Sequence, residues 1–175
     1  MNFLFQLKTL IPLYTFLLAI KHGYLKAWKI VVSQFKFETA NFTDYKSDEP
    51  VYNICGMRPA NVRSQNRTGE LNGYATFSDY WDCINDFFER NKAFNIKDTD
   101  DVSEWTKSLK DSKYFEANLQ QYNKGVQHYL DVDGSDYNRT IVFFVVGLCA
   151  IVGGVVYLFY HFAKKKAGIN IGRYK

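Results

Sequence analysis

Proline, cysteine and histidine are scarce in this chain of 175 residues, and each shortage excludes a class of protein. Three prolines are too few for a proline-rich linker protein. Cys149 lies in a long apolar run, which leaves Cys55 and Cys83 as the one pair that could bond. Because there is no CxxC motif and the three histidines are scattered, we expect no disulfide framework, no metal site and no cofactor.

Acidic residues are missing from the last 13 positions, and this uneven charge says more than the net charge of +4. Residues 163–175 carry five Lys or Arg side chains and no Asp or Glu. The other 162 residues carry 17 basic and 18 acidic side chains, so they are close to neutral. A nearly neutral body excludes a domain that binds nucleic acid through a broad basic face.

The longest apolar run lies just before that basic tail. Residues 141–162 contain no Lys, Arg, Asp or Glu, and these 22 residues match the thickness of a bilayer core. The run predicts a transmembrane helix, in which Gly147, Gly153 and Gly154 would permit close helix contact and make a homo-oligomer one candidate partner. The predicted organisation is a domain over 1–130, a polar, turn-prone linker over 131–139, a transmembrane helix over 140–162 and the tail over 163–175.

The N-terminal segment is also apolar, from Thr9 to Ile20. Pro12 interrupts this run, and no small-x-small cleavage site of a signal peptide follows it. The run is too short for a second membrane span. We expect an amphipathic or buried helix, with Pro12 in its first turn and Gly23 just after its end.

The rest of the domain reads as helices around a small hairpin. Apolar residues at spacings of three and four predict helices over 25–38 and 115–129. Residues 60–77 predict a short hairpin whose turn is TGELNG. The predicted fold class is therefore mainly α, with one β-hairpin and a C-terminal transmembrane helix.

Two further helices are marked by polar residues at their starts. Ser78 is the predicted N-cap of a helix that includes YWDCINDFFER. Asp101 and Glu104 have the spacing of a capping box before a second, shorter helix.

Glu38 occupies a physically unusual position. It follows Val31 by seven residues and Phe35 by three, which places it on the apolar stripe in the last turn of its helix. Apolar neighbours and the negative end of the helix dipole both disfavour a carboxylate, so we expect a raised pKa for Glu38. A carboxylic acid that keeps its proton near neutral pH is what glycosidic-bond cleavage requires. The alternative is a glutamate at a frayed helix end, exposed to solvent.

The residues around Glu38 belong to an ordered set of motifs. The segment QFKFETANF (34–42) is followed by NICGMR (53–58), by the hairpin, by GYATFSDYWDCINDFF (73–88) and by DSKY (111–114). This order over about residues 10–130 resembles the glucosaminidase domain family of peptidoglycan hydrolases, in the lysozyme superfamily. The matching residues are Gln34, Glu38, Thr39, Asn53, Gly56, Met57, Arg58, Tyr74, Phe77, Trp81, Asp82, Ile84, Asp86, Asp111 and Tyr114.

The resemblance implies a lysozyme-like fold and cleavage of the β-1,4 glycosidic bonds of peptidoglycan strands. It implies that Glu38 is the catalytic acid and that Glu70, at the hairpin tip, positions water. Asp44, Asp48 and Glu49 are rival candidates for the second role. If no second carboxylate reaches the sugar, the N-acetyl group of the substrate would be the nucleophile, or the enzyme would be a lytic transglycosylase that forms a 1,6-anhydro product.

The same motifs imply a glycan-binding groove walled by Asn53, Arg58, Tyr74 and Tyr114. The chain departs from the family at Ser108, where a tyrosine near the reacting sugar is common, and Trp105 is the candidate substitute. Cys55 and Cys83 also stand at positions where the family carries other residues. These departures keep open a third possibility, which is a catalytically weak, membrane-bound glycan-binding or structural subunit.

Charges on either side of the apolar run bear on location. Lys164, Lys165 and Lys166 follow the run and aspartates precede it, so the positive-inside rule places the domain outside the cytoplasm. One setting is the bacterial cell envelope. The other, which needs no export signal, is the internal membrane of a lipid-containing bacteriophage, where a virion-associated lysin would open the wall for genome entry. In that setting the basic tail would face packaged DNA or lipid head groups.

Overall fold

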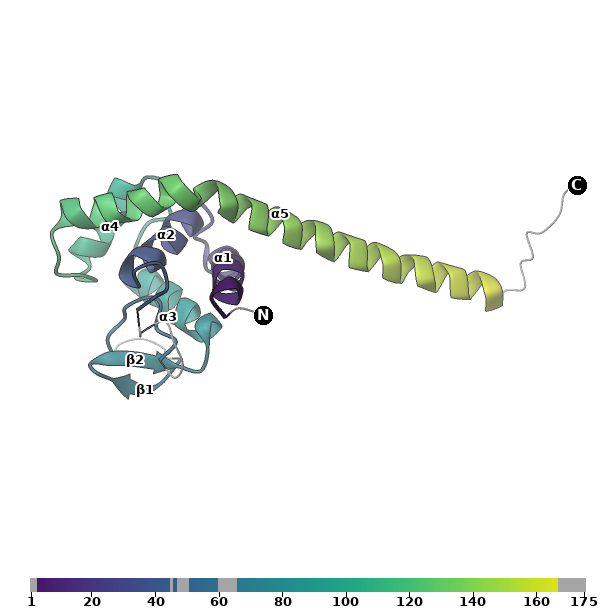
Figure 1. The fold of residues 1–175 in the computed structure, drawn as a ribbon, viewed down its shortest axis with the longest axis horizontal. Helices are drawn as coiled ribbons and strands as arrows, with labels where there is room; N and C mark the ends of the chain where they lie inside the picture. Colours follow the sequence, from purple (N-terminus) through teal and green to yellow (C-terminus); the bar gives the residue numbers. More distant parts are fainter. Residues whose placement is uncertain (1–2, 45, 47–50, 60–65, 167–175) are drawn as a thin grey trace, which may run out of the picture.

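The computed structural model describes residues 3–44, 46, 51–59 and 66–166. The chain is mainly helical, with one small antiparallel sheet, as the sequence predicts. Its elements are α1 (Phe3–His22), α2 (Trp28–Glu38), β1 (Arg67–Leu71), β2 (Tyr74–Phe77), α3 (Tyr80–Ala93), α4 (Val102–Asp111) and α5 (Leu119–Lys166). In Figure 1 the hairpin lies at one end of the domain, and α5 extends far beyond the other elements.

Helix α2 forms the centre of the domain, because it packs against both α1 and α5. The predicted apolar stripe is confirmed, since Trp28, Val31, Val32 and Phe35 are all buried. The helix begins three residues later than predicted, and Leu25 is exposed. The stripe therefore fixes which face of α2 enters the core and brings Glu38 to the edge of that core.

Helix α1 differs from its prediction at Pro12. The proline lies inside the helix rather than in its first turn, because α1 already begins at Phe3. The predicted C-terminus is confirmed: α1 ends at His22, and Gly23 follows with a φ of +83°, a conformation that favours glycine. Residues Ile11, Leu18 and Ala19 are fully buried, so one face of α1 belongs to the core.

The hairpin turn is shorter than the predicted TGELNG, because residues 68–71 belong to β1. Strands β1 and β2 pair in an antiparallel register, and Asn72 and Gly73 form the turn with φ of 52° and 79°. Positive φ at both central residues is typical of a type I′ hairpin turn. Glu70 is therefore not at the tip but inside β1, where it pairs with Ala75. The predicted first strand was ANVRSQNR (60–67), of which residues 60–65 lie outside the described residues and Arg67 begins β1.

Helices α3 and α4 begin with aspartate caps. The N-cap of α3 is Asp79, whose side chain accepts a hydrogen bond from Asp82 N at 2.9 Å, so the prediction of Ser78 was wrong by one residue. The predicted Asp101 cap of α4 is confirmed, since its carboxylate accepts from the backbone of residues 103 and 104. The Glu104 side chain bonds Thr99 at 2.8 Å, so the reciprocal half of a capping box is replaced by a contact to the preceding loop.

Helix α5 is one continuous element of 48 residues, and this corrects the prediction of a linker over 131–139. That segment is helical because it packs on the domain. Asp133 pairs with Lys36 of α2 at 2.5 Å, and Tyr137 is buried with its ring 6.3 Å from that of Trp28. These tertiary contacts override the low helix propensity of Gly and Asp in this stretch.

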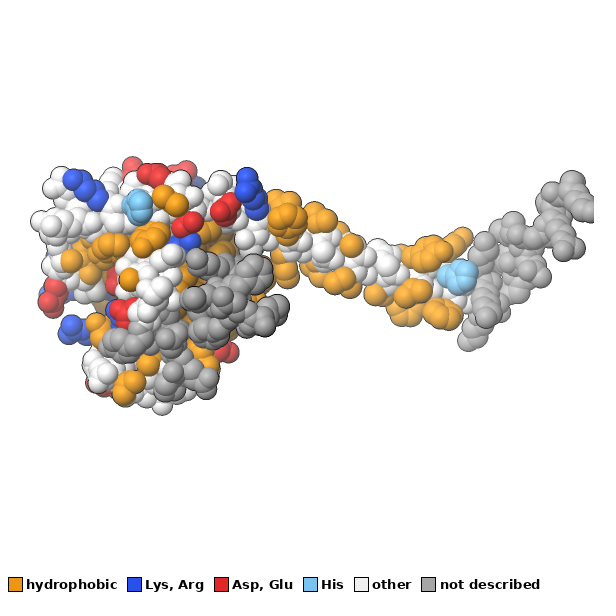
Figure 2. Space-filling view, viewed as in Figure 1, with side chains coloured by type: hydrophobic (Ala, Val, Ile, Leu, Met, Phe, Trp, Pro, Cys, Tyr) orange, Lys and Arg blue, Asp and Glu red, His pale blue; other side chains and the backbone are white. Residues whose placement is uncertain are grey.

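Beyond the domain, α5 carries its apolar side chains into open space. Residues 142–162 are exposed throughout, and Figure 2 shows hydrophobic side chains along the projecting part of the helix. This helix is long and apolar enough to cross a membrane, and among the described residues no other helix meets that criterion. At 1.5 Å per residue, the 22-residue run is about 33 Å long, close to the thickness of a bilayer core. The chain is therefore compatible with a single-pass membrane protein.

Gly125 on α5 lets α2 approach closely, and this generates a stability prediction. A Cβ at position 125 would lie 2.1 Å from the Phe37 ring, whereas one at Gly134 would meet only the flexible end of Leu130 at 3.3 Å. Gly125→Ala should destabilise the full chain by roughly 1–3 kcal/mol through overpacking. Gly134→Ala, the matched control, should be neutral or stabilising by up to about 1 kcal/mol, because alanine is the better helix former. Thermal unfolding in detergent measures both, and equal effects would contradict the packing of Phe37 on Gly125.

Candidate active site around Glu38

The Glu38 carboxyl group lies where the C-terminus of α2 meets α5. The hydroxyl of Tyr122 donates a hydrogen bond to Glu38 Oε1 at 2.5 Å, across 84 residues of sequence. Tyr122 is buried, with 3% of its surface exposed, while Glu38 is only partly buried. The phenol thus holds the carboxyl group in one orientation at the edge of the core.

Burial dominates the electrostatics of this pair. It raises the pKa of the Glu38 carboxyl above its ordinary value, against the opposing effects of the Tyr122 hydroxyl and the Lys46 ammonium group. Burial and the nearby Glu38 charge raise the pKa of Tyr122 well above its ordinary value. Tyr122 therefore keeps its proton and remains the donor, and Glu38 keeps its own proton to a higher pH than an exposed glutamate.

A second layer of hydrogen bonds supports Tyr122. The indole Nε1 of Trp105 donates to Gln34 Oε1 at 2.9 Å, and both side chains are fully buried. Gln34 also acts on the Tyr122 hydroxyl and lowers its pKa slightly against the effect of burial. Trp105 was the predicted substitute for a tyrosine near the sugar. The structure corrects this, because a fully buried indole bonded to Gln34 has no surface to offer a substrate.

Gly56 lies directly against the other oxygen of the carboxyl group. A Cβ at this position would be 3.0 Å from Glu38 Oε2, and the φ of Gly56 is +65°. Both the left-handed backbone and the close approach favour glycine here. A larger residue at position 56 would therefore press against the Glu38 carboxyl group.

The chain leaves α2 through a strained turn immediately after Glu38. Ala40, Asn41 and Phe42 have positive φ values of 47°, 61° and 61°. Left-handed backbone costs roughly 1–2 kcal/mol for an ordinary L-residue, and such strain clusters at functional sites. Thr39 supports the turn, because its hydroxyl donates to Phe35 O at 2.6 Å and accepts from Phe42 N at 3.1 Å.

Lys46 contacts both the C-terminal end of α2 and Tyr74, one of the predicted binding residues. Its ammonium group donates to the backbone oxygen of Glu38 at 3.2 Å and lies 4.9 Å from the centre of the Tyr74 ring. Asp44, one rival for the second catalytic role, pairs with the same ammonium group at 3.6 Å. The other rivals, Asp48 and Glu49, lie outside the described residues.

The remaining predicted binding residues have different surroundings. Asn53 is fully buried, and its amide nitrogen donates to Met57 O and Ala75 O at 2.7 and 2.8 Å. Its amide oxygen accepts from Met57 N at 3.0 Å, so Asn53 shapes the loop and does not form a groove wall as predicted. The Tyr114 hydroxyl donates to the backbone oxygen of Cys55, and Arg58 is exposed.

Glu70 is not brought into contact with Glu38 among the described residues. It is exposed on β1, the strand of the hairpin that faces away from the domain in Figure 1. The role of Glu70 as a second catalytic group stays a prediction.

Cys55 and Cys83 meet beneath Gly56. Both are fully buried and free, and their sulfur atoms lie 3.1 Å apart. Burial and the neighbouring thiol raise the pKa of Cys55 well above its ordinary value, so it is not a nucleophile in the folded protein. In the part of the chain that the structure describes, no three His, Cys, Asp or Glu side chains are grouped so that they could hold a metal ion.

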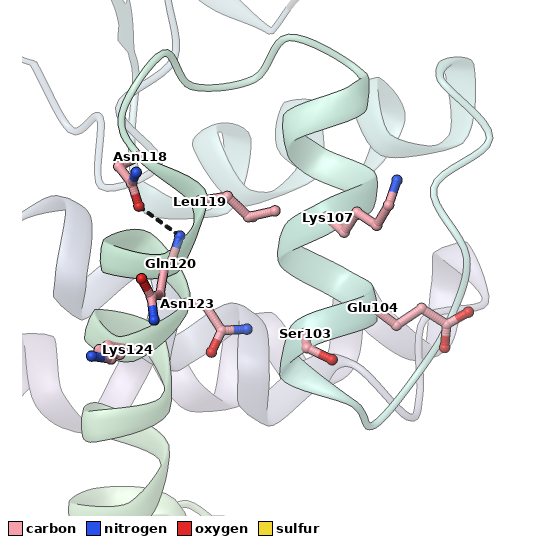
Figure 3. Close-up of a pocket in the computed structure, with 8 residues that line it drawn as sticks. All are labelled: Ser103, Glu104, Lys107, Asn118, Leu119, Gln120, Asn123 and Lys124. Atoms are coloured by element: carbon pink, nitrogen blue, oxygen red, sulfur yellow. Dashed lines mark hydrogen bonds between the residues drawn. The ribbon is translucent and has the colours of Figure 1, made fainter.

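A large open groove lies elsewhere, between α4 and the start of α5. It has a volume of about 830 Å³, and most of its lining residues are polar types that present largely apolar surface to it. Figure 3 shows its residues, which are Ser103, Glu104, Lys107, Asn118, Leu119, Gln120, Asn123 and Lys124. None of these residues was singled out as a binding residue from the sequence. The amides, hydroxyl and lysines can form hydrogen bonds, but the groove does not include Glu38.

Sequence reasoning missed Tyr122 as a site residue. In the sequence it is one of the apolar residues whose spacing of three and four predicts the helix over 115–129, and it is buried in the structure. The one available signal was a phenol at a fully buried position, since a buried hydroxyl needs a hydrogen-bond partner.

The raised pKa of Glu38 predicts a pH-dependent stability difference. A group whose pKa is higher in the folded protein stabilises it below the unfolded pKa, and this contribution is lost as the pH rises through the folded value. Glu38→Gln should therefore be more stable than the parent protein at alkaline pH, and the difference should shrink as the pH falls. Denaturant unfolding over a pH series measures this, with the exposed Glu70→Gln as the control. A Glu38→Gln variant that is less stable at every pH would contradict the assignment.

The chain matches no protein-family model, no curated protein and no solved structure.

Proposed function

We propose that this protein is a peptidoglycan hydrolase of the glucosaminidase type, with a lysozyme-like domain on a membrane anchor, and that Glu38 is its general acid. The observation that carries the proposal is the Glu38 carboxyl group, whose pKa burial raises and which Tyr122 holds in place at the end of α2. The ordered motifs around it support the same assignment, because α2, the loop with Gly56, the hairpin and α3 follow one another as the resemblance requires.

The local geometry suits proton donation. Tyr122 occupies Oε1, so the transferable proton belongs on Oε2. The missing side chain of Gly56 keeps Oε2 from being crowded, because a Cβ at this position would lie 3.0 Å from it. A leaving sugar would receive the proton with its oxygen at hydrogen-bonding distance, about 3 Å, from Oε2. Bond cleavage then leaves Glu38 as a carboxylate, and the Tyr122 hydroxyl and Lys46 favour this charged form.

The second step of the reaction has two candidate forms. In hydrolysis, Glu70 or the substrate's own N-acetyl group assists the attack of water at the sugar carbon. The alternative is a lytic transglycosylase, which uses one acid and forms a 1,6-anhydro ring. This alternative needs no second carboxylate, and Glu70, the candidate for that role, lies exposed on β1.

The anchor fits an enzyme that works on a cell wall next to a membrane. Helix α5 completes the site through Tyr122 and continues directly into the apolar run. Peptidoglycan would be reached either from a bacterial envelope or from the internal membrane of a lipid-containing phage. We favour the phage setting, with the basic tail facing packaged DNA or lipid head groups.

Cleavage of purified peptidoglycan tests the catalytic assignment. Glu38→Gln should lower the rate by on the order of 10²-fold or more, because the amide keeps the shape but has no proton to give. Glu70→Gln should lower it less, since Glu70 acts only on water or substrate position. Mass spectrometry of the released ends separates the reactions: a reducing GlcNAc end indicates hydrolysis and an anhydro-MurNAc end indicates the transglycosylase. No release by the parent protein would favour a glycan-binding subunit, and near-normal cleavage by Glu38→Gln would remove Glu38 from the mechanism.

Protease treatment tests the location. The protein should co-purify with lipid-containing particles. Protease added to the exposed membrane vesicle should remove the domain and spare residues 141–175. A domain found free in a bacterial periplasm, with its N-terminus processed after about residue 20, would contradict the phage setting.

A further inference from the structure

Helix α1 exposes a stripe of aliphatic side chains. Leu10, Leu13, Leu17 and Ile20 recur at steps of three, four and three, which places them on one face of the helix. Leu10 and Leu17 are each 36% exposed and Ile20 is 53% exposed, while the opposite face is buried in the core. No charged residue interrupts the stripe between positions 10 and 20, and α1 contains no acid. Over residues 10–20, the outer face of α1 is therefore apolar and partly exposed, with Leu13 half-buried.

Helix α1 lies beside the part of α5 from which the apolar run begins. Helix α1 packs against α5, and aromatic contacts connect the two: the Phe16 ring lies 5.3 Å from Trp28, which lies 6.3 Å from Tyr137. Ile141, the first residue of the apolar run, itself packs against the domain core. Because Tyr137 and Ile141 are only four residues apart, about 6 Å along the helix, the domain meets the level at which a bilayer would begin.

The direction of α1 also suits a membrane surface. Figure 1 looks almost along α1, whereas α5 runs across the picture. A bilayer crossed by α5 would therefore lie roughly parallel to α1. A helix in that orientation buries its apolar face at the boundary between head groups and acyl chains.

We propose that α1 is a second membrane contact, and that its stripe Leu10–Leu13–Leu17–Ile20 lies in the interface of the same bilayer that α5 spans. This inference rests on the membrane anchoring by α5 stated above, and not on the catalytic role of Glu38. The exposed Lys26 just beyond the helix would reach anionic head groups. Two contacts, one spanning and one lying flat, fix the height and the orientation of the Glu38 site relative to the membrane.

A fluorescent probe on α1 tests the contact. The full chain with Cys149→Ala and Leu17→Cys is labelled with an environment-sensitive dye, which Cys55 and Cys83 escape because they are fully buried. The labelled protein is reconstituted at one copy per nanodisc of phosphatidylcholine and phosphatidylglycerol, with a lipid that carries a nitroxide near its head group. The matched control is Leu71→Cys, because Leu71 is 41% exposed and belongs to β1, which lies away from α5 in Figure 1.

The proposal expects a blue-shifted emission and several-fold stronger quenching for the label at 17 than for the label at 71. Equal, weak quenching at both positions would overturn it. A blue shift at 17 that appears only with two copies per disc would show that a second copy of the chain covers the stripe, and this also overturns the proposal. Native Cys149 reports on α5 separately, since its reaction with a water-soluble maleimide in discs would contradict the membrane anchoring itself. Protection of Cys149 together with an unquenched label at 17 would defeat only the α1 contact.

Discussion

The hydrogen bond from Tyr122 to Glu38 joins the two helices on which the rest of the structure depends. Helix α2 carries the acid at its C-terminal end, and α5 carries the phenol near its start. Both groups are held by the packing of these helices, which includes the Phe37 ring on Gly125 and the ion pair between Lys36 and Asp133. The helix that continues into the apolar run is thus the same helix that completes the site. A disturbance of α5 inside the domain would act on Glu38 directly.

Several features around Glu38 lower the free energy of unfolding of the chain. Burial raises the pKa of the carboxyl group, and Lys46 and Tyr122 offset this only in part. The next turn places three successive non-glycine residues in left-handed conformations. Gly56 then keeps a side chain away from Oε2. Buried charge and left-handed backbone both cost free energy of folding, and such strain clusters at functional sites.

Much of the fold, and the central residue of the site, could be predicted from short-range patterns. The stripe from Trp28 to Phe35 identifies the buried face of α2 and places Glu38 at its edge, and Gly23 and Asp101 mark helix ends through local backbone chemistry. Long-range contacts could not be predicted in this way. Composition alone makes residues 131–139 a linker, but the packing of Tyr137 on Trp28 makes them helical.

The residues of the site divide in the same way, because motif positions alone do not predict their long-range contacts. Asn53 stands at a motif position, yet its three hydrogen bonds hold the loop and β2 together. Tyr122 belongs to no motif, yet it contacts the acid from 84 residues away.

The pKa of Glu38 is the quantity on which the account depends, and it can be measured directly. Carbon-13 NMR of the labelled glutamate carboxyl groups, with Glu38→Gln to assign the signal, gives its titration in the parent protein and in Tyr122→Phe. The account predicts a pKa above the ordinary range of glutamate, and a further rise in Tyr122→Phe because a donor to the carboxylate is lost. Tyr129→Phe on the same helix should leave the titration unchanged. An ordinary Glu38 pKa that is indifferent to Tyr122→Phe would contradict the assignment of Glu38 as a buried, tyrosine-held acid.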